Sequence, residues 1–155
     1  MLVLGIHHVQ ITVPRGAEDD ARRFYCKLLG LVEIAKPQAL QSRGGFWLKA
    51  GTLQVHVGTE DGVARTGTKA HVAYQVTGLA GWRTLLERSG CKVLDSVPIP
   101  GYGRFETRDP FGNRIEFIES VLKKGSDPLE NQGNSPISEP PASAGLKGSD
   151  PFFNT

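Results

Sequence analysis

The segment His8-Val-Gln-Ile-Thr-Val13 recurs 63 residues later as His71-Val-Ala-Tyr-Gln-Val76, and this repeat decides the fold. In both copies apolar residues alternate with polar ones, which is typical of a strand with one buried face. A second repeat, at an offset of 60, matches Leu53-Gln-Val-His56-Val57 with Asn113-Arg-Ile-Glu116-Phe117. The chain therefore contains two tandem halves, each with two candidate ligand residues at equivalent places.

The pattern between these segments predicts one strand, one helix and three more strands in each half. Apolar residues at helical spacing predict helices over 18–29 and 79–89, each ended by a glycine, Gly30 or Gly90. The predicted strands are 5–13, 31–35, 44–50 and 53–58 in the first half, and 70–76, 92–95, 103–109 and 114–119 in the second. The fold class expected is α+β, with βαβββ modules at residues 1–62 and 63–121.

The pattern ends at about residue 122. Residues 122–155 contain five of the ten prolines and no apolar periodicity, so they are predicted to form a disordered tail rich in Pro, Gly and Ser. A short repeat, Lys124-Gly-Ser-Asp-Pro128 and Lys147-Gly-Ser-Asp-Pro151, leaves two interpretations open. The tail is either solvated chain or a paired docking motif for a partner that the sequence does not identify.

Composition excludes several functions. The 155 residues carry a net charge of +2 with no clustered basic face, which argues against nucleic-acid binding. No apolar run approaches the roughly 18 residues of a membrane span. The N-terminus lacks the basic region and cleavage site of a signal peptide. Two cysteines are too few for a disulfide framework, so a cytoplasmic location is expected.

Strand alternation selects among the histidines. His8 shares its face with Gln10 and Thr12, whereas His7 falls on the face of Val9 and Ile11, which is expected to pack under the helix. By the same alternation His56, His71 and Glu116 also face away from the helices. Because these four residues recur at similar spacing in the two halves, they are predicted to be metal ligands.

Glu116 adds a separate argument for a cation. A carboxylate on a central strand of a sheet needs a partner, because burying it unpaired is costly. A divalent metal would satisfy Glu116. The alternative is an arginine, either Arg104 or Arg114.

These residues resemble a known family, the vicinal oxygen chelate superfamily, which includes glyoxalase I, fosfomycin-resistance enzymes, extradiol dioxygenases and bleomycin-resistance proteins. The similar segments cover residues 5–119 and are the two histidine strands, Arg23-Phe-Tyr-Cys-Lys-Leu-Leu-Gly-Leu31, and Arg108-Asp-Pro-Phe-Gly-Asn-Arg-Ile-Glu116-Phe117. The resemblance implies that the modules form a curled mixed sheet around a metal-lined cleft.

The resemblance also places His8, His56, His71 and Glu116 at the family's four ligand positions. Bacterial glyoxalase I usually has a glutamate at the position of His56. Fosfomycin-resistance enzymes and extradiol dioxygenases typically use only the positions of His8, His71 and Glu116. Bleomycin-binding members commonly lack the ligands.

The function expected is that of a metal-dependent, glyoxalase-like lyase or isomerase acting on a small substrate that chelates the metal through adjacent oxygens. Glu116 is the expected catalytic proton acceptor, and the cofactor is a divalent ion, one of Zn, Ni, Co, Fe or Mn. The alternatives are an extradiol-type dioxygenase and a non-catalytic ligand-binding or resistance protein.

Two further expectations concern the surroundings of the site. Trp47, Tyr102, Arg104 and Arg108 come from segments that could reach the cleft, although Trp47 and Phe105 are more readily explained as core. Exposed sheet edges predict a homodimer. Whether the four ligands meet within one chain or across two stays open.

Overall fold

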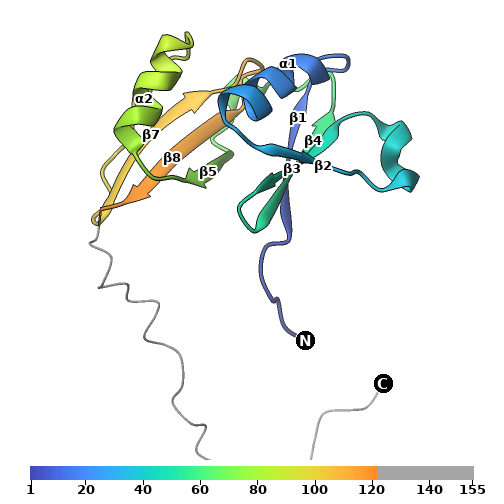
Figure 1. Cartoon of the computed structure of the whole chain (residues 1–155), viewed down its shortest axis with the longest axis horizontal. Coiled ribbons are helices and arrows are strands. Elements are labelled where there is room, and N and C mark those ends of the chain that lie inside the picture. Colours follow the sequence, from blue (N-terminus) through green and yellow to red (C-terminus); the bar gives the residue numbers. More distant parts are fainter. Residues whose placement is uncertain (122–155) are drawn as a thin grey trace, which may run out of the picture. The chain divides into compact units, whose positions relative to one another are not determined.

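The computed structural model describes residues 1–121, and the predicted tail with its repeat lies outside them. These residues form two four-stranded sheets, ordered β1-β4-β3-β2 and β5-β8-β7-β6 (Figure 1). The first contains β1 His8–Val13, β2 Val32–Ile34, β3 Phe46–Ala50 and β4 Leu53–Thr59. The second contains β5 His71–Gln75, β6 Leu94–Asp95, β7 Tyr102–Arg108 and β8 Arg114–Ser120. The α+β class predicted from the sequence is confirmed.

Both sheets have the same mixed pairing. The first strand of each half runs parallel to the last one, β1 with β4 and β5 with β8. The other two strands of each half join as an antiparallel ladder, through β3 on β4 and β7 on β8. This shared pairing places the sequence repeats at equivalent positions of the two sheets.

The helices lie where the apolar periodicity predicts them. The first begins as α1 Glu18–Arg22, with three acidic residues in its first turn that favour the helix dipole, and continues as the π-helical η1 Arg23–Leu28. The second is α2 Leu79–Arg88. Gly30 and Gly90 follow the two helices with φ of 74° and 81°, as expected of helix-terminating glycines.

Two short 3₁₀ segments were not predicted, η2 Gln38–Arg43 and η3 Arg65–Gly67. No helix among residues 1–121 is long and apolar enough to cross a membrane.

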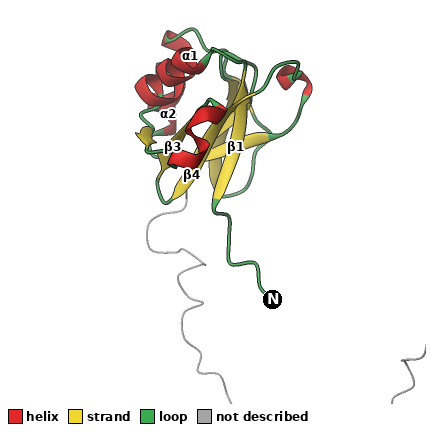
Figure 2. Cartoon of the chain, turned by 90° about the vertical axis from the view of Figure 1, so that its right-hand side faces the viewer, coloured by secondary structure: helices red, strands yellow, loops and turns green. Residues whose placement is uncertain are grey.

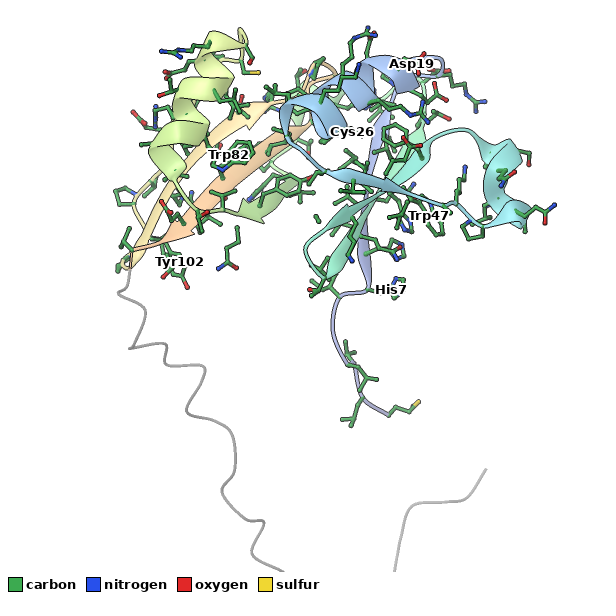
Figure 3. All side chains as sticks on the ribbon, viewed as in Figure 1. His7, Asp19, Cys26, Trp47, Trp82 and Tyr102 are labelled. Carbon is green, nitrogen blue, oxygen red and sulfur yellow. The ribbon has the colours of Figure 1, made fainter. Side chains whose placement is uncertain are left out.

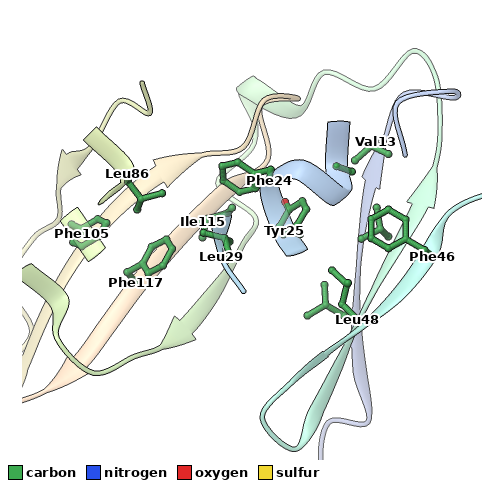
Figure 4. Close-up of a cluster of buried hydrophobic side chains, with 13 residues drawn as sticks. Val13, Phe24, Tyr25, Leu29, Phe46, Leu48, Leu86, Phe105, Ile115 and Phe117 are labelled. Atoms are coloured by element: carbon green, nitrogen blue, oxygen red, sulfur yellow. The ribbon is translucent and has the colours of Figure 1, made fainter. Parts of the chain in front are cut away.

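The core consists of apolar side chains from both halves (Figure 4). In the second sheet the rings of Phe105 and Phe117 stack at 5.2 Å, and Trp82 of α2 packs on Phe117 at 5.3 Å. Phe105 is fully buried, so its expected role as core is confirmed. In the first half, the fully buried Leu48 of β3 and Tyr25 of η1 belong to the same cluster.

A buried polar cluster joins the two halves around Asp109, which is 5% exposed. The hydroxyl of Tyr25 donates to Asp109 Oδ2 at 2.6 Å, and Asn113 Nδ2 donates to the same oxygen at 2.7 Å. Asp109 Oδ1 accepts from the backbone N–H groups of Phe111 and Asn113. Asn113 Nδ2 also donates to the carbonyl of Thr12, 101 residues earlier. One carboxylate thus connects η1, β1 and the β7–β8 turn.

The strands β1 and β5 each have a neighbour on only one side within residues 1–121, so both are edge strands. A cleft of about 580 Å³ lies beside them, lined by apolar residues that include Val9, Val55, Val72 and Tyr74. The chain leads into β1 through residues 1–7, which have no regular structure and whose apolar side chains are exposed (Figure 2). Such edges invite pairing with another chain.

Candidate metal centre

His8 and His56 lie together on the first sheet. Their strands are parallel neighbours, with His8 opposite Gln54 and Gln10 opposite His56, so all four side chains share one face. The two imidazole rings stack with centroids 4.1 Å apart and planes 15° apart. His8 is exposed, whereas His56 is only 8% exposed. The structure therefore brings together the two candidate ligands of the first half.

Trp47 extends this stack. It lies opposite His56 on β3, and its ring covers the imidazole at 3.9 Å with an interplanar angle of 2°. Burial, and then the nearby charge of His8, lowers the pKa of His56 below its ordinary value. His56 is therefore held neutral, which is the form that binds metals. The explanation of Trp47 as plain core is wrong, since it is half-buried on the face that carries His56. The faces of the two sheets that carry the candidate ligands are called the ligand faces below.

Gln54 was expected to share the face of His56, but the contact between the two side chains was not predicted. Its side-chain Oε1 lies 3.0 Å from Nε2 of His56. The signal was present in the sequence, because residues two apart on a strand share a face. Gln54 thus orients His56, and it occupies the ring nitrogen that a metal would take if Nε2 were the ligand atom.

His71 and Glu116 form the matching pair on the second sheet. Nε2 of His71 lies 3.1 Å from Oε2 of Glu116, and Nδ1 of His71 lies 2.9 Å from the carbonyl oxygen of Lys69. A carbonyl only accepts, so Nδ1 carries a proton and donates it to Lys69. Nε2 then faces a carboxylate oxygen, and this contact is stabilised only by a proton or a cation between the two atoms.

Arg104 holds the other oxygen of Glu116. Its Nη1 donates to Oε1 at 3.0 Å, and Glu116 itself is 3% exposed. Of the two arginines considered as partners, Arg104 is therefore the one found, while Arg114 pairs with Glu106 through Nε at 2.6 Å. The buried carboxylate has a cationic partner before any metal is considered. Nε of Arg104 is buried without a hydrogen-bond partner among the described residues.

The remaining candidates have other roles. His7 precedes β1 and is exposed, with Nδ1 3.0 Å from Nδ1 of His8, so the expectation that it faces the core is wrong (Figure 3). Arg108 donates to the carbonyls of Gly112 and Arg65 and supports the β7–β8 turn. Tyr102 is 43% exposed. Burial raises the pKa of the thiols of Cys26 and Cys91, which makes both weak nucleophiles.

The two pairs are equivalent in register but separate within one chain. His8 and His71 occupy the edge strands, and His56 and Glu116 the strands beside them. Within residues 1–121, no group of three or more His, Cys, Asp or Glu side chains is close enough to hold a metal ion. Within one chain the four candidate ligands therefore form two separate pairs.

Residues 5–117 match the family model of the Glyoxalase/Bleomycin resistance protein/Dioxygenase superfamily. The chain belongs to this superfamily. A protein from Bacillus anthracis assigned to the glyoxalase family is 40% identical, with a TM-score of 0.72, and the match covers 77% of this chain and 98% of that one. No curated protein sequence matches the chain.

Two more distant members show the same glyoxalase-superfamily fold. The fosfomycin resistance protein FosX from Listeria monocytogenes is 14% identical, with a TM-score of 0.63 over 78% of this chain and 97% of that one. Lactoylglutathione lyase from Agrobacterium tumefaciens is 19% identical, with a TM-score of 0.59 over 76% and 95%. At these identities the likeness concerns the fold alone.

Proposed function

We propose that this superfamily member is a metal-dependent, glyoxalase-like lyase or isomerase whose small substrate chelates the metal through two adjacent oxygens. The observation that carries the proposal is the pairing of His8 with His56 and of His71 with Glu116 at equivalent registers of the two sheets. The two pairs together offer three imidazoles and one carboxylate. Such a set fits a divalent ion of the Zn, Ni, Co, Fe or Mn group.

The contacts of the second pair support this fit. Nε2 of His71 and Oε2 of Glu116 approach each other as two ligands of one cation do, and the Lys69 carbonyl fixes the tautomer that leaves Nε2 free. The first pair offers a neutral imidazole in His56 and an exposed one in His8. A bound cation would act as a Lewis acid toward the two substrate oxygens.

Glu116 is the proposed proton acceptor. It is buried, which strengthens its interaction with a nearby substrate C–H whose acidity is raised by the neighbouring oxygens. Arg104 holds Oε1 and so leaves Oε2 to face the substrate. Arg104 is thus a positioning residue for the carboxylate.

We propose further that the complete site is built by two chains. If β1 of one chain lies beside β5 of another, His8 and His56 meet His71 and Glu116 of the partner, and a symmetric dimer gains two sites. The unpaired edges of both strands and the apolar cleft beside them support this arrangement. We also propose a cytoplasmic location, because both cysteines are free thiols.

The metal itself is the first test. Protein purified without chelators should contain close to one divalent ion per chain by elemental analysis. The Glu116→Gln variant should lose it while retaining its circular dichroism spectrum. A metal-free wild type that does not take up any of the five candidate ions would contradict the proposal, and with it the dioxygenase alternative.

Chain mixing tests whether the site is shared. One variant carries His8→Ala and His56→Ala, and the other carries His71→Ala and Glu116→Ala. Neither should bind metal alone. Their mixture should regain one ion per mixed dimer, because one of its two sites then contains all four ligands. If all four ligands of a site came from a single chain, the mixture would not regain metal binding.

One observation favours a second candidate, an extradiol-type dioxygenase. Gln54 engages Nε2 of His56, which leaves His8, His71 and Glu116 as a set of two imidazoles and one carboxylate. Such a set leaves three open positions on an iron ion. If Fe(II) binds and His56→Ala retains both iron and catechol-cleaving activity, the dioxygenase replaces the lyase. Loss of hemithioacetal turnover in both His56→Ala and Glu116→Ala supports the lyase.

A further inference from the structure

A hollow of about 250 Å³ opens beside His56 on the ligand face of the first sheet. Its floor is made by Gly58, which lies two residues after His56 on β4 and shares its face. A Cβ at Gly58 would lie 3.0 Å from Nε2 of Gln10. A side chain at this position would therefore press on Gln10, which lines the hollow together with Trp47.

Two cations line this hollow. Lys36 lies two residues before the η2 segment and Arg43 is its last residue, and both contribute to the lining. Lys36 is half-buried and donates a hydrogen bond to the carbonyl of Gly44, which fixes its ammonium group there. Arg43 is exposed. Among residues 1–121, neither cation forms an ion pair and no carboxylate lines the hollow.

The backbone keeps this loop in place. Gly44 and Gly45 have φ of 67° and 70°, and a Cβ at Gly45 would lie 2.1 Å from the carbonyl oxygen of Val57. The loop therefore packs directly on β4. One carboxylate, Glu18, contacts it, but Glu18 accepts from the N–H of Gly45 at 3.4 Å and does not pair with either cation.

We infer that the hollow binds a carboxylate, phosphate or phosphonate group of the substrate through Lys36, Arg43 and Gln10. An arginine fork, an ammonium and an amide N–H together match an oxyanion, and the ring of Trp47 can pack on the adjoining carbon atoms. Same-face residues of a strand are about 6.6 Å apart, so the oxyanion would lie one such step from His56.

The inference rests on the proposed function for the position of the chelating oxygens near His56, and it narrows the substrate class. The substrate is a compact molecule with adjacent oxygens at one end and an oxyanion at the other, joined by a short carbon bridge. Binding of the oxyanion itself needs no metal and no second chain, because every lining residue belongs to the first half of one chain.

The test is a titration of the full-length, metal-free protein at constant ionic strength. The probes are inorganic phosphate and lactate, with neutral 1,2-propanediol for comparison. Calorimetry and the fluorescence of Trp47 in a Trp82→Phe background report binding. Lys36→Gln/Arg43→Gln should weaken anion binding about tenfold or more, as expected for the loss of charge-assisted hydrogen bonds.

Lys49→Gln is the matched control, because Lys49 is an exposed lysine on the face of β3 that carries Trp47 but does not line the hollow. It should change binding by less than about twofold. Arg43→Gln alone alters an exposed side chain and should also weaken binding, which guards against a folding defect in the double variant.

Binding of phosphate alone assigns a phosphate or phosphonate, binding of lactate alone assigns a carboxylate, and binding of both supports a general oxyanion site. The inference is overturned if neither anion binds, if propanediol binds equally well, or if Lys49→Gln weakens binding as much as the double variant. Metal uptake by the same samples separates the two proposals. Anion binding without metal uptake contradicts only the metal site, and metal uptake without anion binding contradicts only the hollow.

Discussion

At the scale of single residues, two arginine–glutamate pairs lie on the ligand face of the second sheet. Glu106 and Glu116 lie opposite each other on β7 and β8, and each is held by its own arginine, Arg114 or Arg104. Because like charges directly opposite are destabilising, the arginines keep this face stable. The Glu106–Arg114 pair lies beside Glu116 on the same face, and its contribution to stability can be measured without a metal.

Glu106→Gln should make the free energy of unfolding less dependent on pH in the acidic range. The hydrogen bond from Arg114, aided by the charges of Arg114 and Arg104, lowers the pKa of Glu106 below its usual value of 4.5. Its stabilisation is therefore complete above pH 4.5 and is lost as the pH falls through the lowered pKa. Urea unfolding should show Glu106→Gln about 1–3 kcal/mol less stable at pH 7, and the difference should shrink by pH 3.

Glu87→Gln is the control for this experiment, because Glu87 is about half exposed and contacts Arg83 only loosely, at 3.8 Å. Its effect should be small at both pH values. A Glu106→Gln defect of constant size from pH 7 to pH 3 would contradict the assignment.

Gly45→Ala should destabilise the protein through a backbone clash. The new Cβ would meet the carbonyl of Val57 at 2.1 Å, at a φ of 70° that already disfavours alanine. We expect a loss of about 2–5 kcal/mol in urea unfolding. Gly62→Ala has a similar φ of 73° with nothing within 4 Å, so it should cost only about 1–2 kcal/mol. Equal losses in the two variants would show that the loop does not pack on β4 as described.

At the scale of elements, the connection between η1 and the β7–β8 turn depends on one hydroxyl. Tyr25 is 1% exposed, and its O–H is one of the donors that stabilise the buried Asp109. Burial, and then the charge of Asp109, raises the pKa of Tyr25 well above its ordinary value, so the hydroxyl remains a donor at every pH of interest.

Tyr25→Phe removes that donor without changing the shape of the ring. Since a hydrogen bond to a buried charge is lost, we expect a cost of about 1.5–3 kcal/mol in urea unfolding at pH 7. Tyr102→Phe, which alters an exposed hydroxyl, should leave stability unchanged. If Tyr25→Phe leaves the free energy of unfolding unchanged, Asn113 and the backbone N–H groups satisfy Asp109 by themselves.

Most elements could be predicted from the sequence, because strands such as β1 and β5 alternate between apolar and polar residues, and both main helices have apolar residues at helical spacing. Segment η2 could not, since Gln38–Arg43 lacks any such period and is positioned by the contact of Gly45 with Val57, 12 residues away. The ligand face, with Gln54 beside His56, was predictable from strand alternation, whereas the stacking of Trp47 on His56 depends on the register between β3 and β4. Side-chain pairing across strands is not encoded locally.

At the scale of the whole molecule, we expect the edge strands β1 and β5 to form the dimer interface. A charge placed on the edge of β5 should prevent pairing with a second chain. Val72 is half-buried and lines the cleft beside β1. We expect Val72→Glu to convert a dimer to a monomer in size-exclusion chromatography with light scattering, with a dissociation constant raised at least about tenfold.

The matched control is Val97→Glu, because Val97 is 80% exposed and does not line the cleft. This variant should remain dimeric. A wild type that is monomeric at high micromolar concentration, or a Val97→Glu variant that dissociates equally, would contradict the role of the edges.

The hydrogen bond from Asn113 to the carbonyl of Thr12 also has a consequence for synthesis. At 5–20 residues per second, a ribosome needs roughly 5–20 s to make the 101 residues that separate donor from acceptor. During that interval the nascent chain lacks Asp109, which accepts from Tyr25, and Asn113, so the carbonyl of Thr12 has only Arg65 as a side-chain donor. Chains stalled before residue 109 should be cleaved rapidly by protease in residues 1–62, and chains released after residue 121 should resist. A chaperone would therefore be needed while only the first half of the chain has been made.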